Sequence, residues 1–228
     1  MDSELIQRIA LFMPALFLSL AVHEYAHAWT ATRLGDATPG RQGRLTLSPL
    51  AHLDPLGSVL FPLLMLVMHP SFLFGWARPV QFNPANFDRR LHMRTGAAIT
   101  AAAGPLSNVA LALLSALALR FALQLGWASQ LPGTGGRMLL EFLSGMFSLN
   151  VLLAIFNLFP LPPLDGHYLL PRSMDEITEW LRRYAFILFI AIFFLPLPGL
   201  GRSLGSFIIH PLMEALMGVL EAIAFYGT

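Results

Sequence analysis

The chain contains no cysteine and no lysine, and charged residues of either sign are scarce. Without cysteine there is no disulfide, no thiolate metal site and no cysteine nucleophile. Only 12% of the 228 residues are charged, about half the share of a soluble domain, whereas 56% are hydrophobic. The net charge of +1 is too small to suggest a nucleic-acid partner. The composition therefore predicts an integral membrane protein.

Apolar segments long enough to enter a bilayer recur along the whole chain, and a full span needs about 20 residues. We expect one all-α polytopic domain over 1–228, with a catalytic core at about 8–170 and C-terminal helices at about 180–228. A short segment at 57–74 is interrupted by proline and predicts a re-entrant or short sixth helix. The five full transmembrane helices are expected at about 5–32, 95–125, 138–159, 184–195 and 204–225.

Arginine placement predicts the orientation of these helices. Arginines follow the first predicted span and precede the second, and cytoplasmic loops carry an excess of such residues. A re-entrant hairpin at 57–74 keeps both groups of arginines in the cytoplasm, with the N-terminus outside. Between them, "RLTLSPL" at 44–50 alternates in hydropathy and predicts a short membrane-associated β-strand near the site, ended by Pro49.

The sequence His-Glu-Tyr-Ala-His at 23–27 lies inside the first predicted span. His23 and His27 are four residues apart, so a helix presents both imidazoles on one face, within reach of one ion. Glu24 lies between them, and in zinc metalloproteases with this spacing the glutamate is the general base. A purely structural role is unfavourable, because an ionised glutamate in lipid costs about 3 kcal/mol on insertion scales. We predict Glu24 to be catalytic.

A catalytic zinc ion needs a third protein ligand. Asp165 is the only acid between Glu141 and Arg172, and it follows a long apolar run. Taken alone it could equally cap a helix, but the two histidines favour a ligand role. One Zn²⁺ with two neutral imidazoles and the carboxylates of Asp165 and Glu24 has no net charge, which favours burial. The sequence thus predicts one zinc ion per chain.

The proline-rich segment "NLFPLPPLDG" at 157–166 leads into Asp165. Its prolines prevent helical hydrogen bonding and leave extended backbone that could pair with an unwound substrate. Pro160 and Pro162 are therefore candidate substrate-binding residues. Asn157 could donate to a substrate carbonyl or a developing oxyanion, or it could serve as a helix-packing amide or C-cap. The residues alone leave these two roles for Asn157 open.

Two further polar residues lie near these motifs. Asn108, in "GPLSN", is in a predicted span, where an amide more often joins helices than takes part in chemistry. His167 is two residues from Asp165 and could support it as a hydrogen-bond partner, although a lone histidine near a membrane interface is usually structural or solvated.

Taken together, these motifs resemble those of the site-2 protease family of intramembrane zinc metalloproteases. The resemblance rests on "HEYAH" at 23–27, "GPLSN" at 104–108 and "NLFPLPPLDG" at 157–166, and it covers about residues 8–170. "GRLTLSPLAHLDPLGS" and "FGWARPVQFNPANF" further resemble compact bacterial members without a PDZ or CBS domain. The resemblance implies His23, His27 and Asp165 as zinc ligands, Glu24 as base and Asn157 as a substrate contact.

The resemblance also implies regulated intramembrane proteolysis in the bacterial inner membrane. Its expected partners are the lipid bilayer and transmembrane helices of substrate proteins, such as anti-sigma factors or signal-peptide remnants. His27 is six residues before Arg33, so a zinc site there lies roughly 9 Å along the helix from the cytoplasmic boundary. We therefore expect the active site toward the cytoplasmic side.

Two other functions use the same residues. A membrane metal-ion transporter could bind its ion with these histidines and Asp165, but repeated halves and a polar path, which transporters often show, are not visible in the sequence. A catalytically inactive relative could bind transmembrane helices without cutting them. The presence of Glu24 beside a full ligand set favours hydrolysis over both alternatives.

Overall fold

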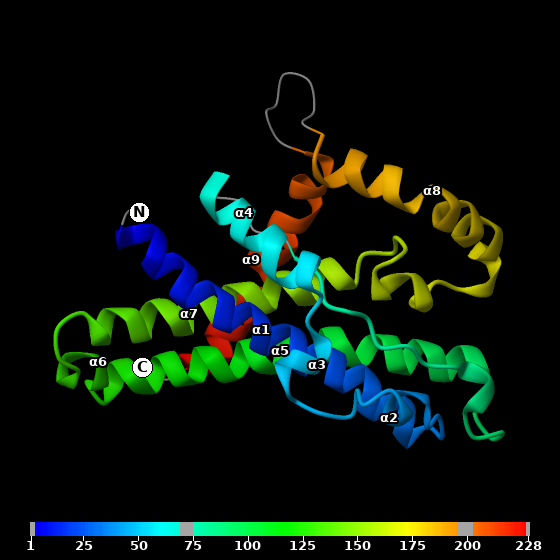
Figure 1. Cartoon of the computed structure of the whole chain (residues 1–228), viewed down its shortest axis with the longest axis horizontal. Helices are drawn as coiled ribbons and strands as arrows, with labels where there is room; N and C mark the ends of the chain where they lie inside the picture. Colours follow the sequence, from blue (N-terminus) through cyan, green and yellow to red (C-terminus); the bar gives the residue numbers. More distant parts are fainter. Residues whose placement is uncertain (1–2, 69–74, 196–202, 227–228) are drawn as a thin grey trace.

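The computed structural model describes residues 3–68, 75–195 and 203–226, and this part of the chain is helical without a β-strand. Figure 1 shows three long helices lying side by side, with a fourth packed against two of them. All four are long and apolar enough to cross a membrane. They are α1 (Ser3–Arg33), α5 (Met93–Gln124), α7 (Gly135–Asn157) and α9 (Leu204–Ala224).

Small residues let these helices approach each other closely. Ala112 and Ala116 of α5 are almost fully buried against Phe147 and Val151 of α7, and Leu220 of α9 closes the same cluster. Lipid tails are as apolar as leucine, so close van der Waals packing and buried polar contacts stabilise a membrane bundle better than hydrophobicity alone. The short helices are α2 (Thr38–Arg41), α3 (Pro49–His52), α6 (Trp127–Gln130), η2 (Pro84–Asn86), η3 (Asp165–Leu169) and η4 (Arg172–Met174).

The predicted span at 184–195 is different in the structure. Residues 184–193 are the apolar second half of α8 (Asp175–Phe193), whose first half carries five charged side chains. For this reason α8 is not among the helices with the composition of a span. It begins beside the start of α5, where Asp175 pairs with Arg94 at 2.7 Å, and ends with Phe193 against Phe156 of α7.

The segment predicted as a re-entrant hairpin begins with the π-helical turn Pro55–Leu60 and continues as α4 (Phe61–Met68). These 14 residues extend for about 21 Å, less than the thickness of a bilayer core. The backbone N–H of Trp76 then donates to the carbonyl of Gly57 at 3.0 Å, so the chain returns to where the helix began. This return supports a re-entrant segment. Residues 69–74 lie outside the described residues.

The strand predicted at 44–50 does not form. Pro49 is the first residue of α3 and so begins a helical turn, because proline suits the first position of a helix. Near this segment, Leu53 and Ala77 form an isolated antiparallel bridge. Extended backbone is therefore present next to the predicted strand, at Leu53, but it forms an isolated bridge and not a strand.

The two ends of the bundle differ. At one end Gln7 of α1 donates to Glu141 of α7 at 2.6 Å, and Arg120 of α5 donates to the carbonyl of Ala224 in α9 at 2.7 Å. Both chain termini lie at this end in Figure 1. The opposite end holds α2, the start of α5 and the start of α8. His23, Glu24 and His27 lie in the second half of α1, nearer along the helix to α2 than to the N-terminus.

Candidate metal centre

The structure brings His23, His27 and Asp165 together. Both histidines are on α1, one turn apart, and are only 4% and 6% exposed. Their Nε2 atoms are 3.0 Å apart, and the Oδ2 atom of Asp165 is 3.2 Å from each of them. Asp165 is the first residue of η3, which packs against α5 after the chain leaves α7. One ligand atom from each residue thus converges on a single point.

The donor chemistry of this cluster fits a zinc ion. His27 Nδ1 donates to the carbonyl of Thr100 at 2.7 Å, and His23 Nδ1 donates to Oδ1 of Asn108 at 2.6 Å. Each neutral ring then has a lone pair on Nε2, and Asp165 Oδ2 is buried with no hydrogen-bond partner among the described residues. Tetrahedral zinc with bonds of about 2.0–2.1 Å spaces its ligand atoms about 3.3 Å apart, close to the separations seen here.

Two glycines allow the ligands to approach each other. A Cβ atom on Gly104 of α5 would lie 2.4 Å from Nε2 of His27, in the space next to the ligand atoms. A Cβ atom on Gly166 would lie 2.1 Å from the backbone oxygen of Leu158. Both contacts are far too short for any side chain. Glycine is thus required in "GPLSN" because the backbone of α5 passes against the histidine rings, and in "LDG" because two backbone segments pass against each other next to Asp165.

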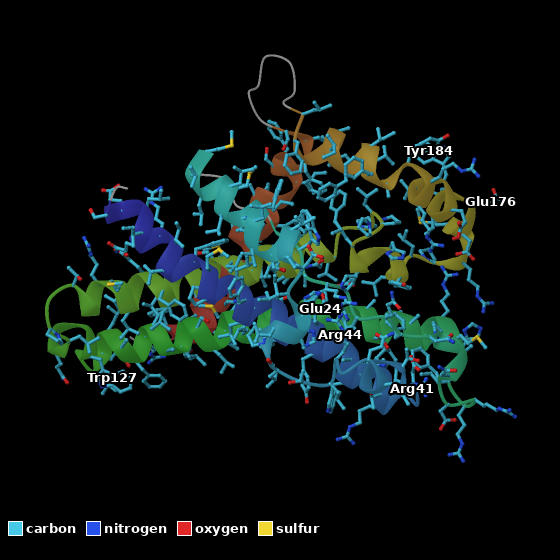
Figure 2. All side chains as sticks on the ribbon, in the orientation of Figure 1. Glu24, Arg41, Arg44, Trp127, Glu176 and Tyr184 are labelled. Carbon is cyan, nitrogen blue, oxygen red and sulfur yellow. The ribbon has the colours of Figure 1, made fainter. Side chains whose placement is uncertain are left out.

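Glu24 is buried beside the metal ligands, with 7% of its surface exposed. Its Oε2 atom accepts a hydrogen bond from the backbone N–H of Val80 at 2.8 Å, which fixes the carboxylate against the extended segment after Ala77. Burial and the nearby Arg78 lower the pKa of Arg44, whereas the Glu24 carboxylate raises it. Glu24 and Arg44 are thus within electrostatic reach, and Figure 2 shows them close together in the middle of the molecule.

The predicted substrate-binding residues lie on the segment that carries Asp165. Asn157 is the last residue of α7, is partly buried, and donates from Nδ2 to the carbonyl of Leu153 at 2.9 Å. In the turn that follows, Pro160 is exposed and Pro162 is buried. All three residues therefore lie on the segment that connects α7 to Asp165. Their contact with a substrate stays a prediction.

The sequence alone did not reveal all the hydrogen bonds that orient the histidines. Asn108 is fully buried, and besides accepting from His23 it donates to Asn150 of α7 at 2.8 Å. Its interpretation as a packing residue is therefore incomplete, because it both joins two helices and holds a ligand. Asn150 itself was not singled out, although a polar amide in the middle of an apolar span is the signal that could have revealed it. His167 donates from Nδ1 to the carbonyl of Leu164 at 2.6 Å.

A helix long and apolar enough to cross a membrane, with this histidine and glutamate pattern and a distant aspartate beside it, is the arrangement expected of a membrane zinc metalloprotease. The chain is 36% identical over 204 residues to "Putative zinc metalloprotease YwhC" of Bacillus subtilis, covering 88% of this chain and 84% of YwhC. It therefore belongs to the zinc metalloprotease family that includes YwhC.

More distant relatives carry a similar name. The chain is 28% identical to "Putative zinc metalloprotease Rip2" of Mycolicibacterium smegmatis and 30% identical to Rip2 of Mycobacterium tuberculosis. These alignments cover 71% and 78% of this chain, but only 56% and 64% of the two relatives. No family model and no solved structure matches the chain.

Proposed function

We propose that this protein is an intramembrane zinc endopeptidase of the site-2 protease type, which hydrolyses peptide bonds within or next to transmembrane segments of membrane proteins. The observation that carries the proposal is the position of the His23, His27 and Asp165 cluster. Two ligands come from the interior of a membrane-spanning helix and the third from a segment that follows another such helix. A soluble substrate would not need a site at this place.

The residues of the chain divide the work of hydrolysis. Zinc held by His23, His27 and Asp165 would act as a Lewis acid on the scissile carbonyl and activate a water molecule for attack. Glu24 would take the proton from the attacking water and then deliver it to the departing amine nitrogen. The hydrogen bond from Val80 holds the Glu24 carboxylate in place for this transfer.

The segment after α7 is the proposed substrate cradle. Asn157 would donate to a substrate carbonyl near the scissile bond, which requires its amide to leave the carbonyl of Leu153. The backbone around Pro160 and Pro162 would hold the substrate extended, since a helical peptide bond is not open to attack. The proposed partners are single transmembrane helices, among them anti-sigma factors and signal-peptide remnants, presented from the lipid bilayer.

The proposed location is the bacterial inner membrane, with the site toward the cytoplasm. Arg33, Arg41, Arg94 and Asp175 lie at the end of the bundle that holds α2 and the start of α8. An excess of arginine marks the cytoplasmic side of a membrane protein. Water would enter the site from this end.

The test combines zinc content with cleavage of a reporter transmembrane segment in detergent, for the wild type, Glu24→Gln and Asp165→Ala. We expect Glu24→Gln to keep one zinc per chain and lose cleavage by at least about 100-fold, the lower range of a general base. Asp165→Ala should lose both. Glu179→Gln, on the exposed face of α8, is the matched control and should change neither. Zinc binding without cleavage by the wild type would favour the inactive relative or the metal-ion transporter.

A further inference from the structure

A continuous chain of hydrogen bonds joins α1, α5 and α7 and ends on a metal ligand. Ser19 Oγ donates to the carbonyl of Ala15 at 2.7 Å and accepts from Nδ2 of Asn150 at 2.9 Å. Asn108 Nδ2 donates to Oδ1 of Asn150 at 2.8 Å, and Asn108 Oδ1 accepts from His23 Nδ1 at 2.6 Å. Ser19, Asn108 and Asn150 are fully buried. Bulk water therefore cannot replace these residues as hydrogen-bond partners of one another.

The direction of the bonds in this chain is set mainly from its far end, and a longer contact of 3.5 Å from Asn108 Nδ2 to the backbone carbonyl of Ser19 acts in the same direction. Asn150 Nδ2 also donates to the backbone carbonyl of Met146 at 2.8 Å, and a carbonyl can only accept. A flipped Asn150 amide would set its oxygen against the Met146 carbonyl and its nitrogen against the nitrogen of Asn108, so both amides would lose buried hydrogen bonds, at a cost of about 1–3 kcal/mol for each group left unpaired. Asn150 must therefore present its oxygen to Asn108. Asn108 in turn presents its nitrogen to Asn150 and its oxygen to His23.

This fixed direction decides which nitrogen of His23 carries hydrogen. Facing the Asn108 oxygen, Nδ1 is the donor, so Nε2 has a free lone pair directed into the site. If the Asn108 amide rotated by half a turn, its nitrogen would face Nδ1, and the hydrogen of a neutral ring would move to Nε2. The position of the hydrogen on His27 does not depend on an amide in this way, because its Nδ1 donates to the backbone carbonyl of Thr100, which cannot flip.

We propose that Asn150, supported by Ser19, is a positioning residue for the metal ligand His23: it locks the Asn108 amide and thereby keeps Nε2 of His23 available to the metal. The proposal rests on the candidate zinc site of the proposed function. It makes the two histidines unequal, because one is held by an amide that can turn and the other by a backbone carbonyl that cannot.

Zinc affinity gives the first readout, measured in detergent by competition with a chromophoric chelator. Asn150→Leu should weaken zinc binding by about 10- to 100-fold, the usual effect of removing a group that orients a ligand. Ser19→Ala should cost less than about tenfold, because the Met146 carbonyl still holds Asn150. Ser115→Ala is the matched control, since this buried serine of α5 also donates to the carbonyl four residues back but is not part of the chain of bonds. It should leave the affinity unchanged.

A rescue experiment separates this role from general packing. Asn108→Asp gives His23 Nδ1 an acceptor that has no donor face, so it does not need Asn150 to orient it. The double variant Asn108→Asp, Asn150→Leu should bind zinc at least about tenfold more tightly than Asn150→Leu alone. Absence of rescue, or wild-type affinity in Asn150→Leu, would overturn the proposal.

The hydrogen on His23 can also be observed without zinc, from ¹⁵N spectra of the metal-free protein with labelled histidine. The wild type should show His23 protonated at Nδ1, and Asn150→Leu should show a mixture, with His27 unchanged in both. His23→Gln and His27→Gln assign the signals. Failure of the wild type to bind zinc would count against the proposed function, whereas an unchanged His23 signal in Asn150→Leu would count against the positioning role.

Discussion

Gly104 of α5 and His27 of α1 approach so closely that a Cβ atom on the glycine would lie 2.4 Å from Nε2 of the ring. The same Cβ would be 2.6 Å from Cε1 of His23. The backbone of α5 thus forms one wall of the metal centre. A methyl group there would occupy the space beside the nitrogen atoms that would bind zinc.

We therefore expect Gly104→Ala to abolish stoichiometric zinc binding and cleavage while the protein stays helical. Zinc content after gel filtration and circular dichroism in the same detergent measure both. Gly145→Ala is the control, because this exposed helical glycine of α7 has no atom within 4 Å of the added methyl group. It should bind zinc normally. One zinc per chain in Gly104→Ala would show that the contact is not as tight as described.

Gly166→Ala tests the position of Asp165 separately from that of the histidines. Its Cβ would meet the backbone oxygen of Leu158 at 2.1 Å, and since backbone cannot move aside, the aspartate next to it must shift. We expect zinc affinity to fall by at least about tenfold, toward the level of Asp165→Ala. Chelator competition measures the fall, and Gly218→Ala, open on α9, should cause none. Equal loss in the control would point to general destabilisation.

Asp36 provides a pH prediction outside the membrane-spanning helices. Burial raises the pKa of this carboxyl group, but hydrogen bonds from Thr38, Asn83 and Asn86 outweigh burial and hold the pKa below its ordinary value. A lowered folded-state pKa stabilises the fold above the unfolded value of about 3.9 and loses this contribution as the pH falls through the folded value.

We expect Asp36→Ala to lower the thermal midpoint in detergent by an amount that is constant from about pH 5 upward and shrinks below about pH 4. Thermal unfolding of both proteins across this range measures the difference. Asp88→Ala is a suitable comparison, because Asp88 is in the adjacent loop and receives a backbone hydrogen bond from Arg90. A difference between wild type and Asp36→Ala that grows as the pH falls would contradict the assigned direction.

The arrangement of the helices predicts on which side of the membrane the two termini lie. Gln7 contacts Glu141 and Arg120 contacts Ala224, so both termini lie at the end of the bundle away from the arginine-rich loops. Five full spans would have placed the termini on opposite sides. We expect a reporter that is active only outside the cytoplasm to be active when fused to the C-terminus, and inactive when inserted after Arg89. A cytoplasmic C-terminus would show that α8 completes a crossing.

The sequence predicted the long helices well, because runs such as α1 and α5 are apolar over more than the thickness of a bilayer. The span predicted at 184–195 is not among the four helices with the length and composition of a span, for a specific reason. An apolar stretch of ten residues in α8 was counted without the charged turns that precede it in the same helix. The prediction of a strand at 44–50 was wrong because alternating hydropathy indicates one strand but does not show whether a second strand is available to pair with it.

The residues of the candidate metal centre could be predicted from the sequence only as far as their spacing along the chain indicates that they come together. Two histidines a turn apart share a face on any helix, whereas Asp165 is 138 residues beyond His27, and only its isolation in an apolar run and a family resemblance pointed to it. The contacts of Thr100 and Val80 use backbone atoms, which no side-chain pattern reports. Asn150 needs the three-dimensional register of α5 against α7 before its role is visible.

The division of the ligands between two separate segments makes the centre sensitive to helix sliding. His23 and His27 move as a unit with α1, whereas Asp165 moves with the segment that follows α7. A slide of α1 by one residue is about 1.5 Å, almost half of the 3.2 Å that separates each histidine nitrogen from the carboxylate. Bilayer thickness and tilt act on helix position in this way. The lipid environment is therefore expected to tune metal affinity mechanically, without contacting the metal.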